Sequence, residues 1–233
     1  MLMSIFKKNS SFFDNYFEIY DKKGVKIKLS FAIIVLVLIN SFIDPVTYSY
    51  FDQIKNIYIL QGFDIIYEYL IPLCSLFIVF YTFFNDYKDR IYELIQFYNK
   101  GNYNYIIIFK FFIPVGIILT GSFISGLIYY RQVSFLDLTN IYLSIRFLPN
   151  IIFICSMFLF ITVLTKKSYA GILTTTTYII IDFLTSGHLF KIFSMGANMY
   201  NFYYCISPSY YIINRVLLII LSVFFLYKSF KNN

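Results

Sequence analysis

The sequence has few charged residues, three cysteines and one histidine, and each shortage excludes a class of protein. Charged side chains make up 13% of the 233 residues and hydrophobic side chains 59%, whereas a soluble domain has about 25% charged and about 45–50% apolar residues. The cysteines show no C-x-x-C or Cys/His spacing, so neither a disulfide framework nor a zinc site is predicted. With His188 as its single histidine, the chain also lacks the H-E-x-x-H pattern of zinc peptidases.

Sequence patterns of catalysis and of nucleic-acid binding are missing as well. There is no G-x-x-x-x-G-K-[ST] phosphate loop, so the chain alone is not expected to use ATP. The run from Gly121 to Gly126 does not match the G-x-S-x-G spacing of serine hydrolases. Basic residues flank the apolar runs instead of gathering with aromatics on one face, which argues against nucleic acid as a partner. We therefore predict no catalytic residue, no metal site and no cofactor.

What the chain does have is six apolar stretches, each long enough to cross a bilayer. A span requires about 20 apolar residues at a rise of about 1.5 Å per residue, and such segments form α-helices because helices satisfy their own backbone in lipid. The polar, acidic start of the chain and the lack of a small-residue cleavage site disfavour a cleaved signal peptide. We predict an all-α polytopic membrane protein with spans near residues 27–48, 67–84, 106–129, 145–165, 169–190 and 212–227.

The 19 lysines and arginines fall unevenly on alternate loops. With a cytoplasmic N-terminus, the outer side holds only Lys55, Arg131, Arg146, Lys191 and Arg215. The cytoplasmic side holds the others, namely Lys7, Lys8, Lys22, Lys23, Lys26, Lys28, Lys88, Arg90, Lys100, Lys110, Lys166, Lys167, Lys228 and Lys231. This bias satisfies the positive-inside rule and predicts that both termini are cytoplasmic.

Residues 1–26 are predicted to form an amphipathic helix at the inner membrane surface, ahead of a six-helix domain over residues 27–233. Aromatic residues recur with helical spacing from Phe12 to Tyr20, opposite acidic and amide residues. Because that polar face is acidic, attraction to anionic lipid must come from the lysines that follow it. These lysines act either as snorkelling anchors or as a specific lipid site.

The largest cytoplasmic loop, between the second and third spans, carries the main functional signal. Residues 86–99 are predicted to form a short helix, with Asn85 as its N-cap and Gly101 after its end. On this helix Asp86 and Arg90 lie at pairing distance. Apolar residues form one stripe and charged residues face elsewhere, so the helix presents a two-faced surface to a cytoplasmic partner.

In this loop the chain resembles the membrane subunits of ABC-2-type ABC transporters, in which an acidic coupling helix joins the second and third spans and a lysine opens the third. Asp86 matches the acidic residue, Glu93-Leu94-Ile95 a Glu-Leu-Leu-like run, and Lys110 the lysine. Asp89-Arg90 stands where that family has Gly-Thr. The resemblance extends to an interfacial N-terminal helix, six spans and a short extracellular re-entrant segment, here residues 191–211.

The resemblance implies a permease subunit of an ATP-driven exporter in a bacterial plasma membrane, without a catalytic site of its own. A separate ATP-binding subunit would hydrolyse ATP and push on the coupling helix, and a second permease, identical or similar, would complete the transporter among membrane lipids. Peptide or lantibiotic-type antimicrobials are the cargo that this analogy favours. The residues expected to couple to the ATP-binding subunit are Asp86, Lys88, Asp89, Arg90, Glu93 and Leu94.

Asp182 is the most deeply placed ionisable residue, and an intramembrane carboxylate is costly enough to mark a functional candidate. It could line a translocation path, or it could hydrogen-bond to the threonine run 174–177 of a neighbouring helix. Pairing with His188, six residues on, is disfavoured because the two lie on different helical faces.

Small residues four apart in the third span, Gly121 with Ser125 and Ser122 with Gly126, predict close helix packing.

Two other functions remain open. One is a non-transporting membrane immunity or adaptor protein, whose loop would bind some other partner. The other is an ion-coupled carrier, which the single buried carboxylate supports weakly because no inverted repeat of interrupted helices is visible.

Overall fold

The computed structural model describes residues 24–45, 65–88, 92–93, 97, 103–132, 135–196 and 208–231. All regular secondary structure in these residues is helical. Its elements are α2 (Val25–Ile43), η1 (Ile66–Leu70), α4 (Ile71–Lys88), α6 (Tyr103–Tyr129), α7 (Leu138–Ile145), α8 (Leu148–Thr165), α9 (Ser168–Leu184), η2 (Lys191–Phe193) and α11 (Pro208–Lys231). The interfacial helix predicted in residues 1–26 falls outside the described residues, except for the start of α2.

Within this described part, five segments are long and apolar enough to cross a membrane: Val25–Ile43, Ile66–Lys88, Ile107–Tyr129, Asn140–Thr165 and Ile212–Lys231. These segments confirm the all-α class and match five of the predicted spans. The protein is therefore an all-helical chain compatible with a multi-pass membrane protein.

The span predicted at residues 169–190 is a shorter helix than expected. α9 has 17 residues and ends at Leu184, because Ser186 and Gly187 adopt left-handed backbone conformations with φ of 53° and 77°. The Gly187 amide then donates to the Asp182 carbonyl at 2.9 Å, which closes the helix end. At about 1.5 Å per residue, α9 is about 26 Å long, so a sixth span stays a prediction.

Two prolines explain where the observed elements break. Pro149 has no amide proton to donate to the carbonyl of Ile145 and its ring crowds that carbonyl, so α7 ends at Ile145 and the predicted span 145–165 corresponds almost entirely to α8. Pro72 has the same effect on the carbonyl of Glu68, and here the chain forms the π-helical turn η1 before α4 begins.

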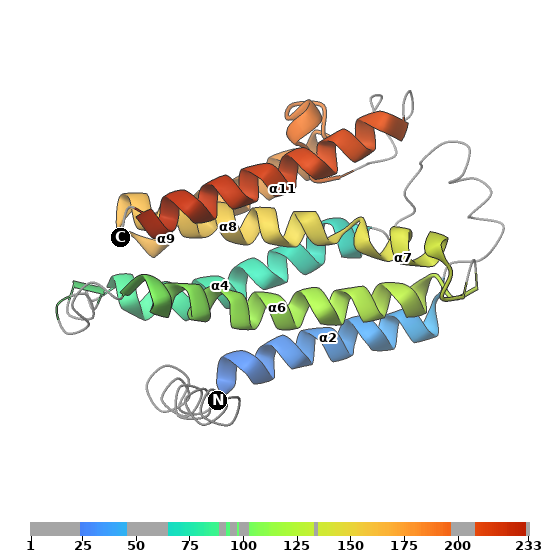
Figure 1. Ribbon diagram of the computed structural model, residues 1–233, viewed down its shortest axis with the longest axis horizontal. Helices are drawn as coiled ribbons and strands as arrows, with labels where there is room; N and C mark the ends of the chain where they lie inside the picture. The colour runs from blue at the N-terminus through green and yellow to red at the C-terminus, as the bar shows by residue number, and fades with distance from the viewer. Residues whose placement is uncertain are drawn as a thin grey trace, which may run out of the picture.

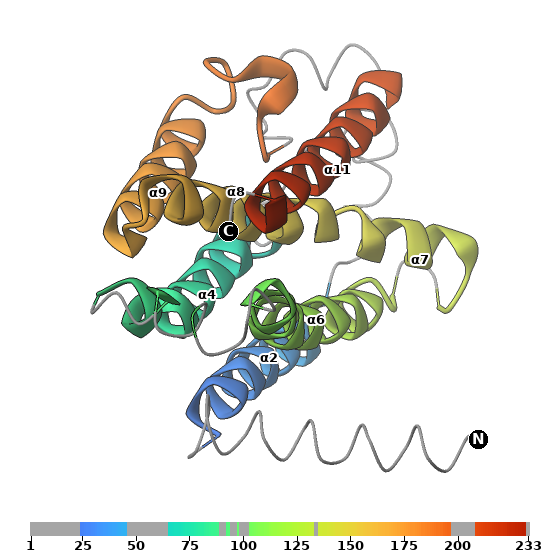
Figure 2. The ribbon, with the colours of Figure 1, turned by 60° about the vertical axis from the view of Figure 1, so that its left-hand side comes forward.

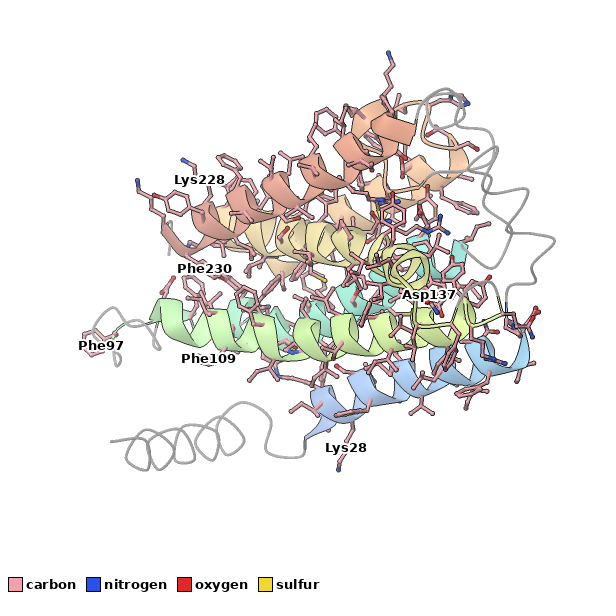
Figure 3. All side chains as sticks on the ribbon, turned by 45° about the vertical axis from the view of Figure 1, so that its right-hand side comes forward. Lys28, Phe97, Phe109, Asp137, Lys228 and Phe230 are labelled. Atoms are coloured by element: carbon pink, nitrogen blue, oxygen red, sulfur yellow. The ribbon has the colours of Figure 1, made fainter. Side chains whose placement is uncertain are left out.

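The helices run up and down in a bundle with α8 near its centre (Figure 1). α8 packs against α4, α6, α9 and α11, whereas α2 packs on the outside against α6 and α4. We call the end where α2 begins and α4 and α11 finish the lysine end, because Lys28, Lys88, Lys167 and Lys228 lie there. The opposite end, where α2 and α6 finish, is called the network end. Figure 3 shows Lys28, Phe97 and Lys228 toward the lysine end and Asp137 toward the other.

Small residues bring helices close together, as the sequence predicted for α6. A Cβ atom added to Gly121 would overlap the side chain of Ile34 in α2, and one added to Gly126 would lie 3.0 Å from Ser144 in α7. Ser125 bonds to the Ser41 hydroxyl of α2 at 2.7 Å. The helix-packing interpretation of these residues is confirmed.

A valine at Gly171 is expected to destabilise the bundle by about 1–3 kcal/mol, because overpacking a tight contact forces side chains or backbone to move. A Cβ atom at Gly171 would overlap the Thr162 hydroxyl and lie 3.0 Å from the Phe158 carbonyl oxygen, which belongs to the rigid backbone of α8. Thermal unfolding of the purified chain in detergent measures the loss.

The matched control is Gly116→Ala, because nothing lies within 4 Å of a Cβ atom added there. Replacing a helical glycine with alanine in open space is expected to be neutral or stabilising by up to about 1 kcal/mol. Equal destabilisation by both variants would show that the α8–α9 contact is not tightly packed.

Candidate functional sites at the two ends of the bundle

A buried ion pair lies at the network end. Arg215 of α11 donates from Nη2 to Glu68 Oε1 of η1 at 2.7 Å, and their side chains are 8% and 0% exposed. Arg215 Nη1 also donates to the Asn150 side-chain oxygen and to the Met195 carbonyl. A charged pair shielded from water is stabilised by hydrogen bonds to its remaining polar groups, and these two contacts supply such bonds to Nη1 of Arg215.

Asn150 of α8 links the pair to the backbone around it. Its side-chain nitrogen donates to the Met195 carbonyl at 2.8 Å and to the Glu68 carbonyl at 3.3 Å. The Glu68 carbonyl is available because Pro72, four residues later, has no amide to donate to it. The proline and the asparagine therefore act together to place the Glu68 backbone beside α8.

Asp182 belongs to the same network, which extends to Tyr69 and the segment after α9. Its Oδ2 accepts bonds from the Tyr69 hydroxyl at 3.1 Å, the Ser194 hydroxyl at 3.1 Å and the Met195 amide at 2.9 Å. The residue is fully buried, and Oδ1 has no hydrogen-bond partner among the described residues. The Asp182 carboxylate thus holds residues 194–196 in place at the network end of the bundle.

The two alternatives for Asp182 can now be compared with its contacts. The threonines 174, 175 and 176 donate to carbonyls of their own helix, not to Asp182, so that predicted partner is wrong. Structural hydrogen bonding is observed with other groups, and a role in lining a path stays a prediction.

The described part of the predicted re-entrant segment folds back toward α11. After η2, Ser194 and Met195 are fully buried, and Asn214 of α11 donates to the Ser194 carbonyl at 2.9 Å. Residues 197–207 lie outside the described residues. At the far end of the prediction, residues 208–211 belong to α11, because Pro208 is well suited to the first position of a helix.

Sequence reasoning missed Glu68, Asn150 and Arg215 as members of a site. Arg215 was assigned to the outer set of charges, although it lies inside the predicted span 212–227. Glu68 lies inside the span predicted to begin at residue 67. The signal available was that two opposite charges fall within spans at the same end of the bundle, where each requires a partner.

A second buried ion pair lies toward the lysine end. Lys110 of α6 donates to Asp86 Oδ2 of α4 at 2.6 Å, with side chains 2% and 9% exposed. The prediction that Asn85 caps a separate helix is wrong, because α4 continues without a break through Asn85 to Lys88. Likewise, the described partner of Asp86 is Lys110, in another helix, whereas Arg90 lies outside the described residues.

A cavity of about 530 Å³ lies at the lysine end, lined by residues at the end of α4 and in the turn from α8 to α9. Figure 2 shows the end of α4 and the start of α9 side by side. Its lining includes Lys88 and Glu93, two of the six residues predicted to couple to an ATP-binding subunit. Asp86 is buried nearby, and Asp89, Arg90 and Leu94 lie outside the described residues. The remaining lining residues are Tyr87, Tyr92, Thr165, Lys166, Lys167, Ser168 and Tyr169.

Other kinds of site receive no support from the residues that the structure describes. Among them, no cluster of three or more histidine, cysteine or acidic residues could hold a metal ion. No known protein family, curated protein or solved structure matches this chain. The class that the fold defines is therefore that of an all-helical protein compatible with several membrane crossings.

Proposed function

We propose that this chain is the membrane-spanning permease subunit of an ATP-driven exporter of the ABC-2 type. A separate ATP-binding subunit would dock at the lysine end, in the cytoplasm, and a second permease, identical or similar, would complete the transporter. The proposal rests on the resemblance in the loop after α4 and on the geometry around that loop.

The observation that carries the proposal is the ion pair between Asp86 and Lys110. These two residues stand for the acidic residue and the lysine of the family pattern, and they are 24 positions apart in the chain. Their contact ties α4, in which the coupling segment 86–99 begins, to α6, which follows that segment. Force applied to that segment would therefore reach two spans together, which is what a mechanical coupling requires.

The distribution of basic residues supports a cytoplasmic lysine end. Among the described residues, this end holds Lys26, Lys28, Lys88, Lys110, Lys166, Lys167, Lys228 and Lys231, and the opposite end holds Arg131, Arg146, Lys191 and Arg215. Lysine and arginine accumulate in cytoplasmic loops. With this orientation, both ends of the described chain face the cytoplasm of a bacterial plasma membrane, and the network end faces outward.

In the proposed cycle, the buried network keeps the outer end closed. The ion pair between Glu68 and Arg215 joins η1 to α11, and Asp182 joins α9 to the segment that follows it. Outward opening would separate some of these elements, so the network would have a closed and an open arrangement whose balance ATP binding would shift. Asp182 would then border the path that opens. Export of a peptide or lantibiotic-type antimicrobial remains the favoured substrate class by analogy.

Affinity purification of the tagged chain from native membranes in mild detergent is expected to recover an ATP-hydrolysing protein. Replacing Glu93 with arginine and Leu94 with aspartate together is expected to reduce that recovery at least about tenfold, since a charge reversal and a buried charge at an interface each cost several kcal/mol. The amount of partner per permease, measured by quantitative mass spectrometry, is the readout.

The matched control is Lys191→Glu, a charge reversal at the opposite end of the bundle, which should leave recovery unchanged. If the double variant retains the partner fully, the coupling segment is not the docking site. If no ATP-hydrolysing protein is recovered with the native chain, the non-transporting immunity or adaptor function becomes the better assignment.

A further inference from the structure

The buried network at the network end contains two acidic side chains but one guanidinium. Glu68 accepts a bond from the Arg215 guanidinium at 2.7 Å. The groups that donate to Asp182 are all neutral, namely the Tyr69 hydroxyl, the Ser194 hydroxyl and the Met195 amide. Asp182 is fully buried. If both acids were ionised, the described residues of the network would together carry a net negative charge out of contact with water.

The elements around Asp182 bring no cation into hydrogen-bond contact with it, among the residues that the structure describes. α4 and α8 pack against α9. The charged residues of α4, Asp86 and Lys88, lie at the lysine end, and α8 has no charged residue. The two basic residues that follow Asp182 in the chain, His188 and Lys191, are exposed. The one titratable group bonded to Asp182 is therefore the phenol of Tyr69 from η1.

The hydrogen bonds of Asp182 are distributed as those of a neutral carboxylic acid would be. All three donors reach Oδ2, whereas Oδ1 is buried and has no hydrogen-bond partner among the described residues. An ionised carboxylate can accept bonds at both of its oxygens, whereas a protonated one has a carbonyl oxygen that accepts and a hydroxyl that donates. Oδ2 matches the carbonyl oxygen of such an acid, and Oδ1 matches its hydroxyl.

The relative free-energy costs of the two protonation states also favour the neutral acid. A buried hydroxyl without an acceptor loses one hydrogen bond. A buried ion without a counter-charge loses its hydration, which costs far more, and such a group usually neutralises instead. The three donors to Oδ2 stabilise an ionised carboxylate, but they also bond the carbonyl oxygen of the neutral acid, so they offset only part of this difference.

We propose that Asp182 holds a proton at neutral pH while residues 194–196 are packed against it, and that this proton makes the contact a pH-sensitive latch. The packing is close, because a Cβ atom added to Gly196 would overlap the Tyr69 hydroxyl. Release of the segment would admit water to Asp182, and an aspartate in water is ionised at neutral pH. Opening therefore releases a proton, so a rise in pH favours the open latch. The latch requires no ATP-binding subunit, and its test is independent of the exporter function.

Infrared spectroscopy of the purified full chain in detergent detects the proton directly, because a carboxylic acid and a carboxylate have separate stretching bands. At neutral pH, the native chain is expected to show a carboxylic-acid band that Asp182→Asn loses. The matched control is Asp44→Asn, which removes an exposed carboxylate at the same end of the bundle and should keep the band. A native chain without the band, or a band that survives in Asp182→Asn, would overturn the proposal.

Hydrogen exchange of peptides that cover residues 194–196 measures the latch itself, after correction for the intrinsic pH dependence of exchange. In the native chain, protection is expected to fall about tenfold per pH unit above about pH 5, until the closed chain also loses the proton, because opening releases one proton. Asp182→Asn has no proton to release and should show protection that is independent of pH. Protection in the native chain that is constant or rises with pH, or an equal fall in Asp182→Asn, would contradict the latch.

Discussion

Replacing Glu68 with alanine is expected to destabilise the folded chain by about 3–5 kcal/mol, because it leaves the Arg215 guanidinium buried without its counter-charge. Arg215 is 6% exposed and the Glu68 carboxylate receives its Nη2 at 2.7 Å. Two other described partners of Arg215, the Asn150 side-chain oxygen and the Met195 carbonyl, are neutral and carry no counter-charge. Chemical unfolding of the purified chain in detergent, followed by circular dichroism, gives the free energy.

The double variant Glu68→Met with Arg215→Met is the decisive control. Removing both charges leaves no buried ion unpaired, and such replacements are often neutral, so the double variant should be more stable than Glu68→Ala. Leu36→Ala is the control for truncation, because Leu36 is 67% exposed on α2 and should change stability little. If the losses from Glu68→Met alone and Arg215→Met alone simply add in the double variant, the pair is not coupled in the folded state.

Loss of the ion pair between Glu68 and Arg215 is expected to loosen the segment after α9 more easily than it separates the helices of the bundle. Met195 touches the network from two sides, through its carbonyl to Arg215 and through its amide to Asp182. Loss of the ion pair should therefore loosen residues 194–196 before the helices separate. This order follows from the contacts, because α8 stays packed against α4 and α9 without the pair.

The helices were largely predictable from the apolar stretches, and the boundaries were not. The spans near residues 27–48 and 67–84 correspond to α2 and to η1 with α4, because length and hydropathy are properties of the segment itself. The early end of α9 depends on left-handed backbone at Ser186, a non-glycine residue that gives no strong sequence signal for that conformation. The division at Pro149 had a visible cause, since proline interrupts a helix four residues back.

The sites were less predictable than the helices because they depend on pairs far apart in the chain. Glu68 and Arg215 are 147 positions apart, and their contact requires η1 and α11 to meet beside α8. Asp182 was found from the sequence because a single carboxylate within an apolar run is unusual by itself. Its partners, Tyr69, Ser194 and Met195, could not be named before the chain path was known.

Local rules did not name Lys110 as a partner of Asp86. Spacing along a single helix favoured Arg90, four residues on, whereas the described contact joins Asp86 to Lys110 of the next long helix. Because Lys110 is 2% exposed, its ammonium requires an anion close by. The burial of Lys110, which the sequence does not state, therefore explains why it pairs with Asp86.

Replacing Asp86 with alanine is accordingly expected to cost about 3 kcal/mol of stability, the lower end of the range for a buried pair, because the Asp86 side chain retains 9% exposure. Exchanging the two residues, Asp86→Lys with Lys110→Asp, restores the pair with reversed polarity and should recover more than half of that loss. Lys228→Ala, at the same end of the bundle but outside any described ion pair, is the matched control.

The exchange variant also separates packing from coupling. If the pair serves to transmit force between α4 and α6, as the proposed exporter requires, the exchanged chain should recover both its stability and the activity of the ATP-driven complex. Recovery of stability without recovery of transport would mean that the pair only holds the helices together, and that coupling depends on other residues of the segment 86–99. Failure to recover either property would show that the position of Lys110 accepts only a cation. The residues around the pair, and not only the attraction between its two charges, would then determine which charge lies at each position.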